Sequence, residues 1–286
     1  MKIEEKIKCF KSDSLSKYKT LHHFKNYGEI NSLNDYILYI EWAQQNRKDI
    51  YILGNGSNTL FKNRVIKSLI LKNNMPKEIK CISEENNLYE ISSNVMMNEI
   101  LNYCYKKSLD SFYYLASVPA TLGGALAMNA GEGMHLNKTI YDFVESVTYI
   151  NKDNVIKEIS RKDMKIEYRK TMFTGCQEKF IISAIFKFPN IDLSGIKPIK
   201  DRILWSKEHQ DNVSPNCGSV FKMYNSRILK LIKGFKIGKS QYSSKTQNWI
   251  NNKSSSSITI ILLINITKFL HFIFRKKCKI EVILVK

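Results

Sequence analysis

The amino-acid sequence predicts an α+β protein, and three observations support this. Apolar side chains recur at helical spacing between Asp35 and Gln45, where tyrosine, isoleucine and tryptophan form one stripe. Short apolar runs of strand length, such as residues 51–53 and 180–188, lie between helical stretches. The composition, with 43% hydrophobic residues and 15 Tyr, 14 Phe and 3 Trp among 286 residues, is typical of a globular chain and not of a disordered one.

The predicted elements fall into three parts. The first contains a helix at 35–45, strands at 51–53 and 68–71, and a glycine-rich loop at 54–59. The second begins near Glu78 and contains strands at 88–92, 144–149 and 180–188 and a helix at 96–106. Pro189 and Asn190 end this pattern, and a helical stretch near Lys200 begins the third part. We therefore expect one domain over residues 1–190, with subdomains at about 1–74 and 75–190, and a second domain over residues 191–286.

Charge, cysteine and histidine content argue against several classes of protein. The net charge of +19 comes from dispersed lysines without a recognised nucleic-acid module, so we expect no nucleic-acid partner. The five histidines show no ligand spacing, and we expect no metal site. The N-terminus lacks the apolar segment of a signal peptide, so we expect a cytoplasmic protein. The six cysteines form no C-x-x-C pair, which favours reduced thiols; they are at positions 9, 81, 104, 176, 217 and 278.

A glycine-rich loop follows the strand at 51–53 and reads Gly54-Asn55-Gly56-Ser57-Asn58-Thr59. Glycine permits positive φ and lets another group approach the backbone closely, so such a loop can direct several amides at a phosphate. The dinucleotide-binding fingerprint of a Rossmann fold needs a third glycine where Thr59 stands, so this is not that turn. We expect a larger side chain at Gly56 to block the phosphate while leaving most of the fold intact.

A second glycine-rich stretch spans residues 116–133 and opens with a proline turn. Gly123 and Gly124 stand at the predicted start of a helix, and small residues follow them. Thr121 and Asn129 add polar groups to this stretch. Two phosphate-compatible loops about 65 residues apart in the chain indicate one large ligand held from two sides, and FAD has the required size and pyrophosphate. A tightly packed Ala/Gly-rich helix would have a similar sequence, so the stretch alone leaves both interpretations open.

Five motifs in order resemble the UDP-N-acetylenolpyruvoylglucosamine reductase (MurB) family. The first two are the glycine-rich stretches, 53–58 and 119–131, and the others are Tyr168-Arg-x-x-x-Phe173, Pro215-x-x-Gly-Ser-Val-Phe-Lys222, and Gly234-Phe-x-Ile-Gly238 with Asn248-Trp-Ile-x-Asn252. They span residues 53–252, which are 200 of 286 residues. The resemblance implies a two-part FAD-binding domain of the vanillyl-alcohol-oxidase (PCMH) type followed by a MurB-type α/β substrate domain.

The resemblance also implies the reaction, in which UDP-N-acetylglucosamine enolpyruvate is reduced to UDP-N-acetylmuramate for peptidoglycan synthesis, with FAD as cofactor and NADPH as co-substrate. It implies cofactor contacts from both glycine-rich stretches, at Gly54, Asn55, Gly56, Ser57, Asn58, Thr121, Gly123, Gly124 and Asn129. Tyr168 and Lys222 would bind the UDP-sugar. Another FAD-dependent oxidase or reductase of the same fold, or an inactive flavin-binding remnant, remains an alternative.

Three catalytic roles follow from the resemblance. Arg169 would stabilise the negative charge that develops on the substrate carboxylate, because a guanidinium pairs with a carboxylate in bidentate fashion. Ser219 would donate the proton, and Glu281 would act with the arginine near the developing enolate. A serine hydroxyl is a weak acid, but it is competent toward a strongly basic carbanion when it is positioned correctly.

The chain departs from the family pattern at several positions. Ser117 and Ala120 stand where the family usually has glycine, and Ala120 would be strained if φ were positive there. Met223 replaces an asparagine that contacts the substrate phosphate, and Thr246-Gln247 replaces a His-Ala pair. UDP binding would then be weakened or rerouted through Lys222 and Tyr224.

The C-terminal tail is the largest departure, because residues 254–267 carry no charge. We see no helical alternation in it, and the run is too short for a membrane span of about 20 apolar residues. We expect no membrane partner and a monomer. A shifted reading frame is one hypothesis for the tail, and it would make the match at Glu281 coincidental.

Two other motifs are rejected, one on its spacing and one for lack of a partner residue. Gly234 to Ser240 resembles a P-loop but has three residues between its glycines where four are needed, so we interpret it as a helix end and a turn. Cys217 has no evident histidine partner, so it is not predicted to be a nucleophile and would instead fill space beside the flavin.

Overall fold

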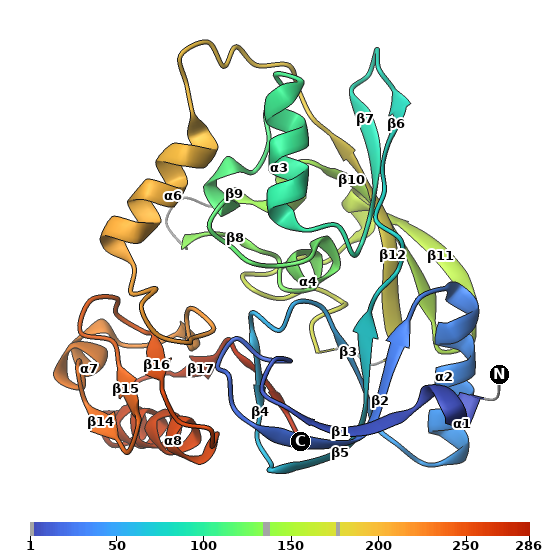
Figure 1. The fold of residues 1–286 in the computed structure, drawn as a ribbon. Coiled ribbons are helices and arrows are strands. Elements are labelled where there is room, and N and C mark those ends of the chain that lie inside the picture. The colour runs from blue at the N-terminus through green and yellow to red at the C-terminus, as the bar shows by residue number, and fades with distance from the viewer. Residues whose placement is uncertain (1–2, 134–137, 176–177) are drawn as a thin grey trace. The chain divides into compact units, whose positions relative to one another are not determined.

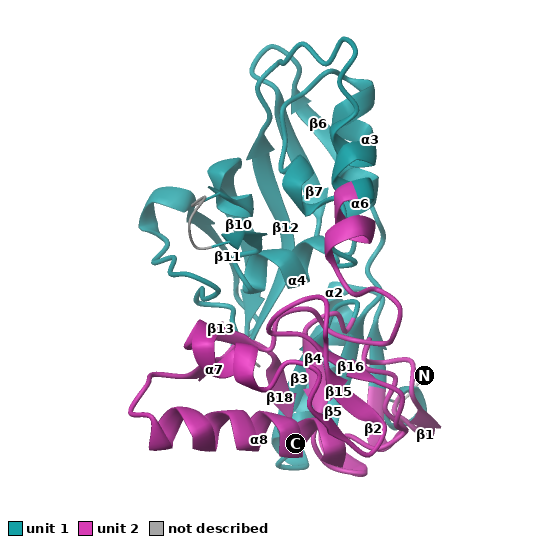
Figure 2. Ribbon diagram, turned by 90° about the vertical axis from the view of Figure 1, so that its left-hand side faces the viewer, with its two compact units in different colours: residues 1–6, 28–55, 69–204 teal, residues 7–27, 56–68, 205–286 magenta. Residues whose placement is uncertain are grey.

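The structure is a computed structural model that describes residues 3–133, 138–175 and 178–286. The chain divides into two compact units, shown in Figure 2. Unit 1 comprises residues 1–6, 28–55 and 69–204, and unit 2 comprises residues 7–27, 56–68 and 205–286. Three of the five divisions fall inside β2 (His22–Ile30), β5 (Val65–Asn73) and α6 (Pro198–His209), and the other two follow Lys6 and Asn55. Unlike the predicted domains, the units are discontinuous, because two N-terminal segments group with the C-terminal part of the chain.

Unit 1 is built on a five-stranded antiparallel sheet with strand order β11-β10-β12-β7-β6. In the central strand, Ala184 pairs with Val147 on one side and Ile91 on the other. Helix α4 packs on β7 and β12, and the buried face of α3 joins the same core through Ile100 and Leu101. The elements are β6 (Ile79–Ser83), β7 (Leu88–Ser92), α3 (Met97–Lys106), α4 (Leu122–Ala127), β10 (Val144–Asn151), β11 (Ile156–Ser160) and β12 (Lys179–Lys187).

Helix α2 (Leu33–Gln45) begins at Ser32, whose side chain accepts a hydrogen bond from the amide of Asp35. It leads to β3 (Ile50–Leu53), which pairs in parallel with the second half of β5. A β-carbon at Gly28 of β2 would lie 2.5 Å from the ring of Tyr39, so glycine lets α2 pack closely. The remaining short elements of unit 1 are α1 (Ile3–Lys6), η1 (Tyr113–Leu115), β8 (Gly131–Glu132), β9 (Lys138–Thr139), η2 (Ile140–Asp142) and η3 (Arg161–Asp163).

Unit 2 combines short strand pairs with two helices around a second core (Figure 1). Strand β1 pairs with the first part of β2, and together with β5 and β3 they make a four-stranded sheet of order β1-β2-β5-β3. Strand β4 pairs in parallel with β18, β13 pairs with β17, and β14, β15 and β16 form an antiparallel sheet. The elements are β1 (Lys8–Ser12), β4 (Thr59–Phe61), β13 (Phe221–Met223), α7 (Ser226–Leu231), β14 (Lys236–Ile237), β15 (Ser240–Tyr242), β16 (Ile250–Asn252), α8 (Ile258–Ile273), β17 (Lys279–Ile280) and β18 (Ile283–Val285).

The C-terminal tail is part of the core of unit 2. Helix α8 buries one face at the helical spacing of Ile260, Leu263, Ile264, Thr267 and His271. The Nε2 atom of His271 accepts a hydrogen bond of 2.9 Å from the amide of Asn225. Our reading of the tail as lacking helical periodicity is therefore wrong. No helix among the described residues is long and apolar enough to cross a bilayer.

Most elements predicted upstream of residue 209 are confirmed, namely α2, β3, β5, β7, α3, β10, β12 and α6. The rejected P-loop is a helix end and a turn, as predicted. Gly234 has φ of +77° just after α7, and Gly238, with φ of +55°, lies in the turn between β14 and β15.

Candidate functional site

The two glycine-rich stretches meet in unit 1. A β-carbon built on Gly54 would lie 2.6 Å from Oγ1 of Thr121 and 3.8 Å from Cα of Gly124. The Nδ2 atom of Asn55 donates a hydrogen bond of 2.7 Å to the carbonyl of Pro119. The end of β3 therefore lies directly against the start of α4, as expected of two loops that hold one ligand.

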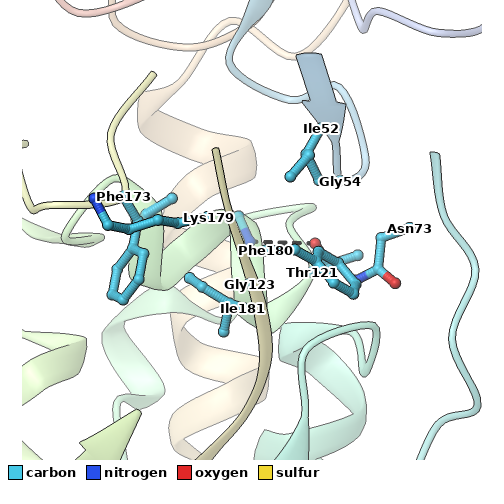
Figure 3. Close-up of a pocket in the computed structure, with 11 residues that line it drawn as sticks. Ile52, Gly54, Asn73, Thr121, Gly123, Phe173, Lys179, Phe180 and Ile181 are labelled. Carbon is cyan, nitrogen blue, oxygen red and sulfur yellow. Dashed lines mark hydrogen bonds between the residues drawn. The ribbon is translucent and has the colours of Figure 1, made fainter. Parts of the chain in front are cut away.

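A pocket opens beside this contact (Figure 3). Its empty space amounts to about 450 Å³, and part of that space is open solvent. Asn73 and Thr121 lie on one side of the view and Phe173 and Lys179 on the other. The lining residues are Ile52, Gly54, Asn73, Thr121, Gly123, Gly124, Ala127, Phe173, Lys179, Phe180 and Ile181. The walls thus combine apolar rings, small residues and one cation.

The amides of the two stretches differ in their hydrogen bonding. Those of Leu122 and Gly123 donate to the carbonyls of Val95 and Ser93, each at 2.8 Å. Within the described part of the chain, by contrast, the amides of residues 55–58 donate to no protein acceptor. A run of free amides is the donor set that a phosphate requires. The first stretch can therefore supply anion donors, whereas the second mainly shapes the wall.

Gly56 is required by the packing of unit 2. Its φ is +66°, and a β-carbon there would lie 2.2 Å from the carbonyl oxygen of Leu15. The amide of Lys17 also donates to the carbonyl of Gly56 at 3.0 Å. A larger side chain would collide with backbone, so the expectation that it would leave the fold intact is wrong.

The Tyr168-Arg169 motif joins the end of the second glycine-rich stretch. The guanidinium of Arg169 donates to the carbonyl of Asn129 at 3.1 Å and to that of Gly131 at 2.7 Å. It also lies over the ring of Tyr168, 5.2 Å from the centroid. Asn129 has φ of +44°, and its Nδ2 atom donates to the carbonyl of Glu167 at 3.0 Å. These contacts fix the position of a cation whose role was predicted from sequence alone.

Ser219, Lys222 and Glu281 come together in unit 2. Lys222 lies on β13, three residues after Ser219, and β13 pairs with β17 just before Glu281. The amide of Glu281 donates to the carbonyl of Val220 at 2.8 Å. Gly218, with φ of +72°, turns the chain immediately before Ser219. The predicted proton donor and the predicted acid thus lie on neighbouring backbone segments.

One residue of the first loop also joins this cluster. The Nδ2 atom of Asn58 donates to the main-chain carbonyl of Glu281 at 3.2 Å. The amide of Ile283 in turn donates to the carbonyl of Asn58 at 3.0 Å. The tail that carries Glu281 is therefore fastened to the loop that precedes β4.

Comparisons with known proteins agree with this geometry. A family model described as "FAD binding domain" matches residues 29–160. The UDP-N-acetylenolpyruvoylglucosamine reductase of Prochlorococcus marinus subsp. pastoris is 30% identical over 266 residues, which are 88% of each chain. The chain therefore belongs to the UDP-N-acetylenolpyruvoylglucosamine reductase family. The enzyme of the same name from Aquifex aeolicus is 27% identical over 253 residues, covering 85% of this chain and 82% of the relative.

A solved structure shares the fold of this family member. The crystal structure of UDP-N-acetylenolpyruvylglucosamine reductase (MurB) from Thermus caldophilus matches with a TM-score of 0.76 at 15% sequence identity. The match covers 98% of this chain and 100% of the other. The family and fold that the five motifs predicted are thus confirmed.

FAD fits the residues of this family member. Gly124 leaves open space at the pocket wall, because a β-carbon there would meet only Oγ1 of Thr121, at 3.4 Å. The Oδ1 atom of Asn129 is buried without a hydrogen-bond partner in the described structure, as expected where a ligand supplies the donor. Lys179 adds positive charge to the pocket wall, which suits an anionic cofactor.

The sequence reasoning missed part of this pocket. Asn73, Lys179 and Phe180 line it but belong to no motif, and Lys72 contacts the carbonyl of Gly54 through its Nζ atom. No sequence signal marks them, because they follow from strand pairing.

The departures from the family pattern have local explanations. Neither Ser117 nor Ala120 has positive φ, so Ala120 is not strained. Thr246 accepts a hydrogen bond from the amide of Asp211 at 2.7 Å, and Gln247 donates to the carbonyl of Ser226 at 2.8 Å. The side chain of Met223 is exposed.

Cys217 is a buried thiol of the core of unit 2. Its sulfur lies 3.6 Å from the carbonyl of Thr59 and 3.7 Å from the hydroxyl of Ser16. Burial raises its pKa to about 12, so the thiol is not an activated nucleophile. The described residues contain no group of three or more metal-ligating side chains that could hold an ion, and Cys176 lies outside them.

Proposed function

We propose that this protein reduces UDP-N-acetylenolpyruvoylglucosamine to UDP-N-acetylmuramate in the cytoplasm, with NADPH as the source of electrons. One observation carries the proposal. The chain is 30% identical to a reductase of this name over 88% of its length. The pocket beside its two glycine-rich stretches, which FAD would occupy, supports the same conclusion. The reaction adds a hydride to the methylene carbon and a proton to the neighbouring carbon, and it consumes the double bond.

Two parts of the chain would hold the cofactor. The free amides of residues 55–58 would bind the pyrophosphate. Phe173 and Phe180, which line the pocket, would give apolar contact to a flat ring. When bound, FAD accepts electrons from NADPH and supplies the hydride to the substrate.

Arg169 stabilises the developing charge. Hydride addition places negative charge on the enolpyruvyl carboxylate, and a fixed guanidinium binds that carboxylate more strongly as the charge grows. The carbonyls of Asn129 and Gly131 hold the guanidinium in place before substrate arrives, so little reorganisation is needed. Tyr168 stacks on the same group and contacts the substrate.

Ser219 delivers the proton from its Oγ atom to the carbon next to the carboxylate. Glu281 lies on the adjacent backbone segment and acts with Arg169 near the enolate that forms at this carbon. Lys222 follows on β13 and binds the diphosphate of the UDP-sugar, since an ammonium is a strong phosphate partner.

Half-reaction kinetics test these roles. In Arg169→Ala and Ser219→Ala, reduction of bound flavin by NADPH should be normal. Reoxidation by the enolpyruvyl substrate should slow by at least ~100-fold, the usual scale for a positioned acid or charge-stabilising group. Slowing of the NADPH step alone would refute both roles.

Arg161→Ala is a matched control. The Arg161 side chain also donates to a main-chain carbonyl, that of Tyr141 at 3.3 Å, and it also lies over a tyrosine ring. It should leave both half-reactions unchanged. Equal effects of Arg161→Ala and Arg169→Ala would mean that the loss is structural.

A further inference from the structure

Helix α8 is apolar on two opposite faces. Its inner face is buried, as described above. At 3.6 residues per turn, the side chains of Ile258, Leu262, Phe269, Phe272 and Ile273 fall on the opposite side, and all are exposed. Phe269 is 60% exposed and Phe272 is 79% exposed. The exposed Asn265 interrupts this apolar surface. Five exposed large apolar side chains on one side of a helix are more than scattered surface residues explain, so this outer face lacks a partner within the unit.

Packing inside unit 2 reaches only one side of the helix. Helix α8 contacts α7, β14 and β15. Figure 2 shows α8 at the edge of unit 2, with α7 and β15 on one side of it. The outer face is defined here as Ile258, Leu262, Phe269, Phe272 and Ile273.

Strong positive charge accompanies this face. Residues 212–280 contain 13 Lys and Arg side chains and no Asp or Glu. Five of these cations lie at the C-terminal end of α8 or just beyond it, and all five are exposed: Lys268, Arg275, Lys276, Lys277 and Lys279. Exposed phenylalanine beside clustered lysine and arginine is typical of a helix that lies in the headgroup region of a membrane.

We propose that the outer face of α8 binds the surface of an anionic lipid bilayer, with the helix lying parallel to it. The phenylalanines enter the boundary between headgroups and acyl chains, and the five cations pair with anionic headgroups. We expected no membrane partner because the apolar run is too short to span a bilayer, but lying on the surface requires no span. The tail departs from its family pattern at this helix.

Charge favours lipid over a second copy of the chain. Two copies joined through this face would bring their cations together without any carboxylate from residues 212–280 to offset them. An anionic bilayer offers complementary charge and an apolar layer at once. Binding would hold the protein at a membrane surface and requires nothing of its catalytic residues.

Vesicle flotation with the full-length protein tests the proposal. The protein should float with vesicles of equimolar phosphatidylcholine and phosphatidylglycerol and not with phosphatidylcholine alone. The double variant Phe269→Glu, Phe272→Glu should lower the partition coefficient at least ~10-fold. Lys276→Gln with Lys277→Gln should lower it about 5-fold for each charge, since a cation near an anionic surface contributes about that factor.

Matched controls use equally exposed residues elsewhere. Val213→Glu changes a side chain that is 91% exposed in the same unit, and Lys80→Gln with Lys157→Gln removes two exposed charges from unit 1. These variants should bind vesicles like the native protein. Because all the changed side chains lie on the surface, every variant should melt at the native temperature.

Three results would overturn the proposal. The first is equal binding to neutral and anionic vesicles, or no binding to either. The second is unchanged vesicle binding by the Phe269→Glu, Phe272→Glu variant, which would mean that charge alone attracts the protein to a polyanionic surface. The third is a dimer in sedimentation that dissociates in the phenylalanine variant, which would assign the face to a second copy.

Discussion

Gly124 offers a direct test of where the cofactor lies. A β-carbon at Gly54 or Gly56 would collide with neighbouring atoms at 2.6 Å and 2.2 Å, so variants there would disturb the protein itself. At Gly124 the nearest atom is Oγ1 of Thr121 at 3.4 Å, and the residue lines the pocket. A side chain added here would enter the pocket without displacing backbone.

The comparison of Gly124→Ala with Gly124→Leu separates size from backbone effects. Both replacements favour helix α4 by up to ~1 kcal/mol, because alanine and leucine have similar helix propensities and glycine a poor one. Leucine adds three further carbon atoms to the pocket. Overfilling a packed site costs about 1–3 kcal/mol, so the Kd for FAD should rise about 5- to 150-fold in Gly124→Leu.

Titration of the apoprotein with FAD, followed by flavin fluorescence, measures this effect. Gly124→Ala should bind FAD within ~5-fold of the native protein, and both variants should melt without FAD at or above the native temperature. Native affinity in Gly124→Leu would show that the cofactor does not occupy this pocket. A lowered melting temperature in Gly124→Leu would show that the added side chain strains the fold.

Further predictions concern stability. Leu263→Ala, in the buried face of α8, should lower the free energy of unfolding by about 2–5 kcal/mol in a urea titration. Leu262→Ala, on the exposed face, should lower it by less than ~1 kcal/mol. Equal effects of the two variants would place the tail outside the core. Burial lowers the pKa of His22 below its ordinary 6.5, so the unfolded chain binds the proton first. The protein's free energy of unfolding should therefore fall as pH drops below 6.5. His22→Gln should make this free energy depend less steeply on pH, and an unchanged pH dependence would contradict this account. Gly56→Val should lower the melting temperature of the apoprotein because its side chain meets the carbonyl of Leu15, and a native melting temperature would refute that explanation.

The sequence predicts elements best where one face alone is apolar. Helix α2 and strand β7 have a single apolar stripe or alternation, and both are found as predicted. Strand β2 was not predicted, because its residues His22 to Ile30 include His, Lys, Asn and Glu among the apolar ones. Strand β2 lies between β1 and β5 in the sheet, and such pairing between distant segments is not visible in local periodicity.

Helix α8 was missed for a different reason. Its inner face is buried by unit 2, and its outer face is largely apolar too, so the sequence shows an apolar run, interrupted at Asn265 and Lys268, in place of a single stripe. The burial of Ile260, Leu263 and Ile264 in the core of unit 2 separates the inner face from the outer one.

Motif order predicts which site residues matter but not why each is needed. The sequence indicates that Arg169 and Asn129 belong to one site, and the structure adds the hydrogen bond between them. The close approach of Gly56 to Leu15 and the bond from Asn58 to Glu281 join segments distant in the chain. Such contacts follow from tertiary structure, and no local pattern encodes them.

The most direct test of the central claim is a single-turnover measurement on the purified protein without oxygen. NADPH should bleach the absorbance of the bound flavin. Addition of UDP-N-acetylenolpyruvoylglucosamine should then restore the absorbance and yield one equivalent of a product two hydrogen atoms heavier, with the mass of UDP-N-acetylmuramate. Flavin that stays reduced until oxygen is admitted, with the substrate recovered unchanged, would contradict the assignment as a reductase of this substrate.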